Sequence, residues 1–180
     1  MFFQVNIILV GFMGTGKTVV GKELAKILKT RFIDVDDLIE QKEGRKISRI
    51  FEEDGEEYFR NCEYKMIKRI SRLDNCVISP GGGAVLEFEN VLNLKKNGII
   101  VCLTALPDVI WKRVKKNKNR PLLKVKNPLK RIKTLLKFRE SYYKQADIFV
   151  DTSKLSVEEV GMKILEEIIG TDYADRKRLY

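Results

Sequence analysis

The amino-acid sequence predicts an α/β fold with three layers, in which a five-stranded parallel sheet lies between two layers of helices. Short apolar segments alternate with amphipathic ones along the chain, as they do when strands buried on both faces are joined by covering helices. The apolar residues Ile7–Val10 lead directly into a glycine-rich stretch at 11–18. Strand, glycine loop and helix in this order are typical of a phosphate-binding loop, so we expect a P-loop fold.

Five strands are predicted from short apolar runs that end in polar or turn-forming residues. They are Val5–Val10, Arg31–Val35, Cys76–Ser79, Gly98–Leu103 and Ile148–Asp151. Ligands of open parallel sheets bind at the carboxyl ends of the strands. A site is therefore expected in the loops that follow the strands, at 11–18, 34–37, 79–83, 104–107 and 151–154.

Helices are predicted where apolar residues recur at helical spacing. The first follows the glycine loop to about Lys29, and the others are Asp37–Glu43, Ile47–Glu53, Glu56–Leu73, Glu87–Lys96, Pro107–Lys116, Pro128–Gln145 and Ser156–Ile169. The apolar side of the Glu56–Leu73 helix is expected at Phe59, Cys62, Met66, Ile70 and Leu73. Ser156 and Glu159 have the spacing of a capping box. The polar and basic segment Asn117–Asn127 is predicted to be an exposed loop.

Length and composition indicate one soluble domain. The chain has 180 residues, 44% hydrophobic and 33% charged, which is enough for a substantial core and typical of a globular protein. No apolar run is long enough to cross a bilayer, and the N-terminal apolar run continues into the glycine loop as a core strand does. We expect a cytoplasmic protein with one domain over 1–170 and a polar tail over 171–180.

The cysteine and histidine counts limit the chemistry. Cys62, Cys76 and Cys102 are widely spaced, and the sequence contains no histidine. A zinc or iron–sulfur site would have almost no ligands to use, and scattered cysteines are typical of reduced thiols in a cytoplasm. Without histidine, a proton acceptor must be a carboxylate, Lys, Tyr or Cys.

The net charge of +10 is concentrated in one segment. Between Lys112 and Arg139 there are 13 Lys and Arg residues and no Asp or Glu. Such a segment can bind nucleic acid, a membrane face or a polyanionic small substrate such as a nucleotide. The glycine loop favours the nucleotide. A nucleic-acid-binding module is the alternative of a different class, although only Trp111 and Phe138 are available there to stack on bases.

The glycine loop has the pattern G-x-x-x-x-G-K-T over Gly11–Thr18. Its glycines allow backbone N–H groups to turn inward around an anion, and the start of the next helix adds a partial positive charge. Lys17 can reach the β- and γ-phosphates, and the Thr18 hydroxyl can ligate Mg²⁺. A glycine-rich turn without function is the simpler interpretation, and the strand before the loop and the helix after it disfavour it.

Three carboxylates, Asp34, Asp36 and Asp37, follow the second strand. Alternation along a strand would place Asp34 and Asp36 on the same side. Beside a phosphate loop, one of these two can hold Mg²⁺ or its water while the other hydrogen-bonds a substrate hydroxyl. For Asp37 we favour the role of N-cap to the following helix.

The second nucleotide-binding signature, a hydrophobic strand ending in Asp, is absent elsewhere, and there is no D-x-x-G or N-K-x-D motif of a signalling GTPase. Asp34 is thus the first candidate to support the metal, with Ser79 as a lesser one. Arg60 has two interpretations, because Glu56 and Glu63 are spaced to hold it in a surface ion-pair ladder. The stretch Gly81–Gly83 suggests either close approach of a ligand or an ordinary turn.

The basic loop and the helix after it contain two further candidates, Arg120 and Arg139. An exposed basic loop that folds over phosphates would supply charge to the transition state and exclude water. For most lysines of this segment, a solvated surface is the simpler interpretation.

Taken in order, these motifs resemble the shikimate kinase family over nearly the whole chain. The matching residues are the glycine loop, Asp34 and Asp36, Gly55-Glu56, Phe59-Arg60, Glu63, Gly81-Gly82-Gly83-Ala84, Arg120-Pro121-Leu122-Leu123, Arg139 and Tyr142. The resemblance implies a nucleoside-monophosphate-kinase-like P-loop fold with a substrate-binding region at about 35–63 and a lid at about 115–125. It also implies ATP-dependent phosphorylation of the shikimate 3-hydroxyl, in the biosynthesis of chorismate and aromatic amino acids.

The resemblance further implies roles for individual residues. Gly14, Thr15, Gly16, Lys17, Thr18 and Val19 would bind the ATP phosphates, with Arg113 along the adenine and Arg120 reaching the phosphates from the lid. One Mg²⁺ per site would be held by Thr18 and, behind a water, by Asp34. Shikimate would be bound by Asp36, Arg60, Gly81, Gly82, Gly83 and Arg139. Lys17, Asp36 and Arg120 would be the catalytic residues, and we expect a monomer with shikimate and ATP as its partners.

The sequence departs from the family pattern in two places: Ser79-Pro80 precedes the glycines, and the lid is rich in lysine. Neither departure removes a functional residue. The nearest enzymatic rival is another small-molecule kinase of the same fold, such as a gluconate or nucleoside-monophosphate kinase. Their acceptors have no ring carboxylate flanked by vicinal hydroxyls, so Arg60, Arg139 and Asp36 would be poorly used.

Overall fold

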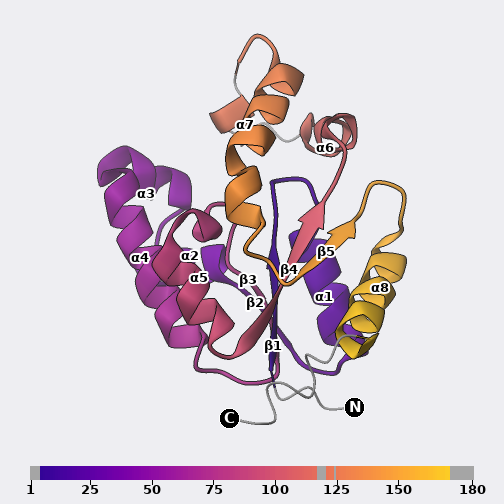
Figure 1. The fold of residues 1–180 in the computed structure, drawn as a ribbon. Helices are drawn as coiled ribbons and strands as arrows, with labels where there is room; N and C mark the ends of the chain where they lie inside the picture. The colour runs from indigo at the N-terminus through magenta and orange to yellow at the C-terminus, as the bar shows by residue number, and fades with distance from the viewer. Residues whose placement is uncertain (1–4, 117–120, 124, 171–180) are drawn as a thin grey trace.

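The computed structural model describes residues 5–116, 121–123 and 125–170 and contains a parallel sheet of five strands between two layers of helices (Figure 1). The strands are β1 (Asn6–Val10), β2 (Arg31–Asp34), β3 (Cys76–Ser79), β4 (Gly98–Thr104) and β5 (Ile148–Asp151). Their order across the sheet is β2-β3-β1-β4-β5, and every pairing is parallel. The predicted fold class is confirmed.

The central strand β1 marks the point at which the chain changes direction across the sheet. β2 and β3 lie on one side of β1, whereas β4 and β5 lie on the other. In open parallel sheets such a switch point leaves a crevice at the carboxyl ends of the strands, where ligands bind. The glycine loop follows β1 and therefore lies at this crevice.

Two helical layers cover the sheet, one on each face (Figure 1). On one face lie α1 (Lys17–Ile27) and α8 (Val157–Gly170), and on the other lie α2 (Val35–Glu43), α3 (Ile47–Glu53), α4 (Gly55–Ile70) and α5 (Phe88–Lys95). Successive side chains of β1 alternate between these layers: Ile7 and Leu9 pack with α1 and α8, whereas Ile8 and Val10 pack with the opposite layer. This alternation explains why β1 is apolar from Ile7 to Val10. The predicted capping box of α8 is confirmed by hydrogen bonds between Ser156 and Glu159.

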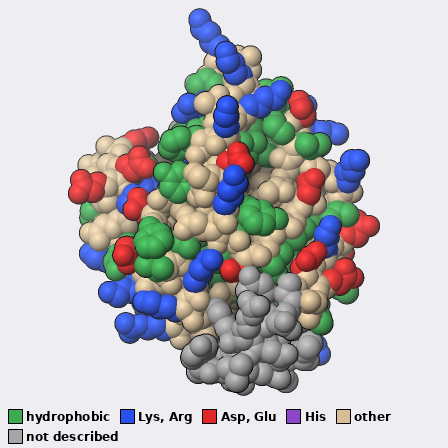
Figure 2. Space-filling view, viewed as in Figure 1, with side chains coloured by type: hydrophobic (Ala, Val, Ile, Leu, Met, Phe, Trp, Pro, Cys, Tyr) green, Lys and Arg blue, Asp and Glu red, His purple; other side chains and the backbone are tan. Residues whose placement is uncertain are grey.

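Two further helices, α6 (Pro107–Val114) and α7 (Pro128–Tyr143), stand beyond the carboxyl edge of the sheet, together with the short 3₁₀ turns η1 (Ala84–Leu86) and η2 (Pro121–Leu123) (Figure 1). Phe12, in the glycine loop, is buried in a separate apolar cluster with Ile110, Val114, Leu123 and Ile132. The glycine loop is therefore packed beneath α6 and α7. Lys and Arg side chains project from this end of the molecule (Figure 2).

The structure corrects the sequence prediction at Asp34–Asp37. β2 ends at Asp34 and α2 begins at Val35, so Asp36 lies in the first turn of a helix and not on a strand. The N-cap is Asp34, whose Oδ1 accepts a hydrogen bond from the Asp36 N–H at 3.1 Å, and not Asp37 as predicted. Strand alternation was therefore the wrong reason to place Asp34 and Asp36 together.

The buried face of α4 also differs from the prediction. The helix ends at Ile70, so Leu73 lies beyond it, and Cys62 is only half-buried. The buried residues are Phe59, Glu63, Met66, Ile67 and Ile70. A carboxylate, Glu63, thus takes a core position where an apolar residue was expected.

Among the helices in the part of the chain that the structure describes, none has the length and apolar character needed to cross a membrane. Cys62, Cys76 and Cys102 are free thiols, and the last two are buried.

Candidate active site

A cavity of about 430 Å³ opens at the carboxyl edge of the sheet. Its walls come from the glycine loop and α1, from the β2–α2 junction, from α3 and α4, and from the glycine turn after β3, with one residue each from η2 and α7. The predicted site residues that line it are Gly14, Gly16, Lys17, Thr18, Val19, Asp34, Asp36, Arg60, Gly81, Gly82, Gly83 and Arg139. Ser79, the lesser metal candidate, also lines the cavity.

The glycine loop depends on backbone conformations that other residues rarely adopt. Gly11 has φ of +135°, and a side chain there would collide with the Leu103 carbonyl oxygen of β4. Gly16, at the N-cap of α1, has φ of +101°. The loop can therefore pass this close to β4 and turn into α1 in this conformation only with glycine at these positions.

Lys17 and Thr15 have different positions in the loop. The Lys17 ammonium donates to the carbonyl oxygens of Gly11 at 2.9 Å and Phe12 at 3.2 Å, so it lies across the loop at the cavity wall. Thr15 is buried outside the lining, and its hydroxyl donates to the Phe12 carbonyl at 2.7 Å. The side chain of Thr15 thus braces the loop, and its backbone N–H donates to the same carbonyl at 3.3 Å.

The carboxylates at the start of α2 lie opposite the loop. Thr18 Oγ1 donates to Asp34 Oδ2 at 3.4 Å, which brings together two oxygen groups suited to a hard cation. Burial, followed by the nearby charge of Asp37, raises the pKa of Asp34. Burial and then the charge of Asp34 raise the pKa of Asp36 to about 6, although Lys17 opposes the rise. Asp36 is therefore a carboxylate whose pKa is shifted toward neutrality, as suits a general base.

Both interpretations of Arg60 hold at once. Its guanidinium lines the cavity and also pairs with Glu56 at 3.0 Å and Glu63 at 2.8 Å. Glu63 is 1% exposed, and burial raises its pKa to about 7 in spite of the Arg60 partner. The ladder that the sequence spacing suggested is thus the support that holds Arg60 toward the cavity.

The glycine turn after β3 lies next to four charged side chains, those of Asp36, Arg60, Arg139 and Lys17. A side chain at Gly81 would lie 2.9 Å from Asp36 Oδ1, and one at Gly83 would lie 2.9 Å from Arg60 Nη1. The Gly82 carbonyl accepts a hydrogen bond from Arg139 Nη1 at 3.1 Å. A Cβ atom at Gly82 would lie 3.9 Å from Lys17 Nζ. Glycine is favoured at 81 by a φ of +90°, and a side chain at 81 or 83 would displace the neighbouring charged group.

Arg139 reaches the cavity from α7. Its guanidinium lies over the Phe12 ring, 5.6 Å from the centroid. Its Nε is buried and has no hydrogen-bond partner within the residues that the structure describes. A buried guanidinium N–H without a partner is costly, and an anionic ligand in the cavity would satisfy it.

Two predicted nucleotide-binding residues, Arg113 and Arg120, are not among the described residues that line the cavity. Arg113, on α6, is not in the cavity lining, and it donates to the Gly14 carbonyl at 3.2 Å and to Thr152 Oγ1 at 2.9 Å. Arg120 lies outside the described residues, as do 117–119 and 124 of the predicted loop that contains it. Leu122, in η2, reaches the cavity.

Sequence reasoning missed part of the lining. Met13, Ile47, Phe51, Phe59 and Leu122 give the cavity an apolar wall, and Phe51 and Phe59 pack with ring centroids 4.8 Å apart. Apolar residues at helical spacing look alike whether they face a core or a cavity, so the sequence carried no signal for them. Glu63 could have been found, because it is four residues after Phe59 and three before Met66, on the buried face.

Comparisons with known proteins match this chain to one family. A family model described as shikimate kinase matches residues 13–169. The shikimate kinase of Thermodesulfovibrio yellowstonii is 52% identical over 162 residues, which cover 90% of this chain and 94% of that protein. That of Caldanaerobacter subterraneus is 48% identical over 164 residues, 91% of this chain and 96% of that protein. A solved structure of shikimate kinase from Acinetobacter baumannii in complex with shikimate has a TM-score of 0.87 and 38% identity, covering 92% of this chain and 93% of that one.

Proposed function

The chain belongs to the shikimate kinase family, and we propose that it transfers the γ-phosphoryl group of ATP to the 3-hydroxyl of shikimate. The products are shikimate 3-phosphate and ADP, in the biosynthesis of chorismate and aromatic amino acids. The observation that supports this most is the glycine turn 81–83. It adjoins Asp36, Arg60, Arg139 and Lys17 at once, so a phosphate-binding loop, a base and two carboxylate-binding guanidinium groups share one cavity.

In the nucleotide half of the site, Gly14–Val19 would hold the ATP phosphates through backbone N–H groups and the N-terminus of α1. Lys17 would exchange its carbonyl partners for the β- and γ-phosphates and stabilise the charge that develops on the transferred group. Arg113 would lie along the adenine, and Arg120 would approach the phosphates from the lid.

The residues beside Lys17 suit one Mg²⁺. Magnesium in kinase sites keeps several waters and takes few protein ligands besides the substrate phosphates. The described residues contain no group of three or more acidic, cysteine or histidine side chains that could hold a metal ion, and such a magnesium ion does not require one. Thr18 and Asp34, whose oxygens lie 3.4 Å apart, would hold it. When bound, Mg²⁺ neutralises charge on the transferred phosphoryl group.

In the acceptor half, Arg60 and Arg139 would pair with the shikimate carboxylate, for which a planar guanidinium is well suited. Gly82 would donate its backbone N–H to the substrate, beside Gly81 and Gly83. Asp36 would bind the 3-hydroxyl and take its proton as the hydroxyl oxygen bonds to the γ-phosphorus and the bond to the ADP oxygen breaks. Lys17 and the positive end of α1 hold the phosphate opposite this carboxylate.

We further propose the organisation and setting of the enzyme. Residues 1–170 would form a single kinase domain, with an acceptor-binding region at about 35–63, a lid at about 115–125 and a polar tail at 171–180. Closure of the lid would exclude water, which otherwise competes for the phosphoryl group. The protein would act as a cytoplasmic monomer, with no role for membranes or nucleic acid.

The assignment is tested by measuring ADP release from ATP and Mg²⁺ by the purified protein. We expect release with shikimate and only background rates with gluconate, CMP or AMP. Activity with a nucleotide acceptor and none with shikimate would overturn the proposal. Steeply salt-dependent binding to DNA or RNA would instead favour a nucleic-acid function for the segment 112–139.

Thr152 provides a separate prediction for the nucleotide half. Its buried hydroxyl donates to the Thr15 carbonyl at 3.0 Å and accepts from Arg113 at 2.9 Å, so it ties the glycine loop to the loop after β5. Thr152→Val should raise the KM for ATP about 5- to 30-fold, since a lost buried hydrogen bond costs about 1–2 kcal/mol. The KM for shikimate should change little, and Thr152→Ser should restore the ATP value. Equal rises in both KM values would contradict this role.

A further inference from the structure

The short helix α3 contributes to the acceptor half of the cavity, and its apolar contacts come from three residues: Ile50 in the core, Ile47 packed against it, and Phe51 on Phe59. It has seven residues, Ile47–Glu53, and Ile50 is its one buried residue. On its cavity side it presents Ile47 and Phe51. Because so short a helix is not stable by itself, contacts outside it must fix where these two side chains lie.

Polar contacts hold α3 at its beginning. Glu40, on α2, accepts a hydrogen bond from the Ile47 N–H at 3.0 Å through Oε1 and pairs with Lys46 at 2.6 Å through Oε2. Acceptance by a carboxylate satisfies one of the unpaired N–H groups at the helix start. The start of α3 is thereby tied to α2.

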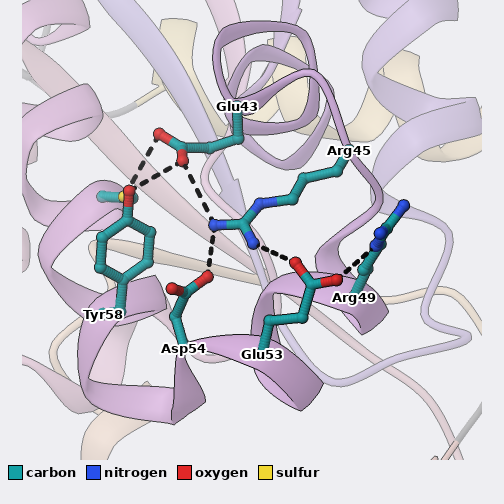
Figure 3. Close-up of polar contacts among 7 residues, drawn as sticks. Glu43, Arg45, Arg49, Glu53, Asp54 and Tyr58 are labelled. Atoms are coloured by element: carbon teal, nitrogen blue, oxygen red, sulfur yellow. Dashed lines mark hydrogen bonds and ion pairs between the residues drawn. The ribbon is translucent and has the colours of Figure 1, made fainter.

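A single guanidinium, that of Arg45, holds the end of α3. Arg45 lies in the connection before α3, and its Nη1 contacts Glu53 Oε2 at 2.5 Å while its Nη2 pairs with Asp54 (Figure 3). Glu53 is the last residue of α3 and Asp54 joins it to α4. Arg45 thus links the segment before α3 to the end of α3 and to the residue after it.

The same guanidinium also faces α2 and α4. Glu43, at the end of α2, lies 3.9 Å from Arg45 Nη2, and the Tyr58 ring of α4 lies 5.9 Å from the Arg45 guanidinium carbon. Tyr58 in turn donates its hydroxyl to Glu43 at 2.9 Å (Figure 3). Arg45 therefore fixes α3 relative to α4, the helix that positions Phe59 and Arg60 in the cavity.

We propose that Arg45 is a positioning residue for the acceptor, acting through α3 on the apolar wall formed by Ile47, Phe51 and Phe59. The inference rests on the proposed function of the cavity. Arg45 does not line the cavity, so its effect on the acceptor has to pass through α3 and the packing of α3 against α4. The glycine loop, which holds the nucleotide, has no part in these contacts.

Exposure gives this arrangement a distinctive property. The Arg45 side chain is 23% exposed and that of Glu53 is 42% exposed, so salt screens the contacts that hold α3 more than it would screen buried ones. Acceptor affinity should consequently weaken with ionic strength more steeply when Arg45 is present. Salt also screens the pairing of the shikimate carboxylate with Arg60. The informative quantity is therefore the difference between wild type and an Arg45 variant in the slope of the shikimate Kd against ionic strength.

The test compares Arg45→Met with the wild-type protein, because methionine keeps an apolar stem but removes the charge and the donors. We expect the KM for shikimate and the calorimetric Kd to rise roughly three- to tenfold, as several exposed charge contacts are lost. The KM for ATP should stay within twofold, and the slope of the shikimate Kd against ionic strength should become shallower. Arg45→Lys should recover part of the affinity.

Arg49→Met is the matched control. Arg49 pairs with the same Glu53 at 2.5 Å, but it is 67% exposed, and among the residues that the structure describes it forms no ion pair with Asp54 or α4. Its loss should therefore leave both KM values near those of the wild type. An unchanged shikimate KM in Arg45→Met, or a parallel rise in the KM for ATP, would overturn the inference. If the wild-type protein does not phosphorylate shikimate, the proposed function itself fails. If Arg45→Met does not fold, the slope of the shikimate Kd against ionic strength is measured with Glu53→Gln instead. A slope equal to that of the wild type would overturn the inference.

Discussion

Replacing Asp36 by asparagine should lower kcat for shikimate phosphorylation by roughly 10²- to 10⁴-fold, the range that general-base catalysis contributes. Asparagine keeps the size of the side chain and can still hydrogen-bond the hydroxyl, but it cannot take the proton. The KM for ATP should remain near the wild-type value because Asp36 lies on α2, across the cavity from the glycine loop. Steady-state kinetics with both substrates varied would measure these effects.

The pH dependence provides a second readout for Asp36. Its pKa is raised to about 6, and only the ionised carboxylate can accept a proton. The wild-type kcat/KM should fall about tenfold per pH unit below pH 6 and level off above it, and this inflection should vanish in Asp36→Asn. Asp37→Asn is the control, since Asp37 is exposed and outside the cavity lining. The inflection should persist in this variant but move to lower pH, because the Asp37 charge helps to raise the pKa of Asp36. A wild-type rate in Asp36→Asn would exclude Asp36 as the base.

Loss of stability should not account for the loss of activity. The folded protein holds the Asp36 proton more tightly than the unfolded chain, since the pKa is raised from 3.8 to about 6. Ionisation of Asp36 therefore lowers the free energy of unfolding as pH rises from about 4 through 6, and the cost persists at higher pH. Asp36→Asn removes that cost, so its melting temperature at pH 8 should equal or exceed that of the wild type.

Replacing Arg60 by alanine should raise the KM for shikimate by roughly 30- to 150-fold, as expected when a charge-assisted pair worth about 2–3 kcal/mol is lost. The KM for ATP should change little. Removal of Arg60 also takes away the partner of buried Glu63, whose pKa, already raised to about 7 by burial, should rise further. Glu63 would then be protonated at neutral pH, which avoids an unpaired buried charge.

Two controls separate acceptor binding from folding. Arg69→Ala alters an exposed arginine on the same helix and should leave both KM values unchanged. The double variant Arg60→Ala/Glu63→Gln should show the same rise in shikimate KM as Arg60→Ala. Equal losses for ATP and shikimate in Arg60→Ala would mean that Arg60 does not bind the acceptor.

The sequence spacing could not show that both interpretations of Arg60 hold, because the two describe the same contacts. Glu56 and Glu63 at helical spacing predict a ladder, and the ladder forms. Whether a ladder lies in solvent or at a cavity depends on what packs against the helix. Here Gly83 comes so close that a side chain there would lie 2.9 Å from the guanidinium, and it belongs to a turn more than twenty residues away along the chain.

Asp34 and Asp36 illustrate a correct grouping reached for a wrong reason. Strand alternation was expected to align them, but α2 begins at Val35 and Asp34 caps it. They line the same cavity because a helix that starts at the carboxyl end of β2 has its first turn at the edge of the sheet. Local sequence favours Asp at either place, as strand end or as cap, and only the packing of α2 selects between them.

The sequence by itself determined the α/β class, the glycine loop and the family, because these depend on apolar periodicity and on motifs read over short stretches. The tertiary structure decided what the loop faces: the Asp36 carboxylate, the guanidinium groups of Arg60 and Arg139, and an apolar wall from α3 and α4. These residues are distant along the chain and meet because parallel strands bring their carboxyl ends to one edge. Glu63, Thr152 and Arg45 support the site only because folding brings these distant segments together, and the spacing of residues along the sequence does not show which segments meet.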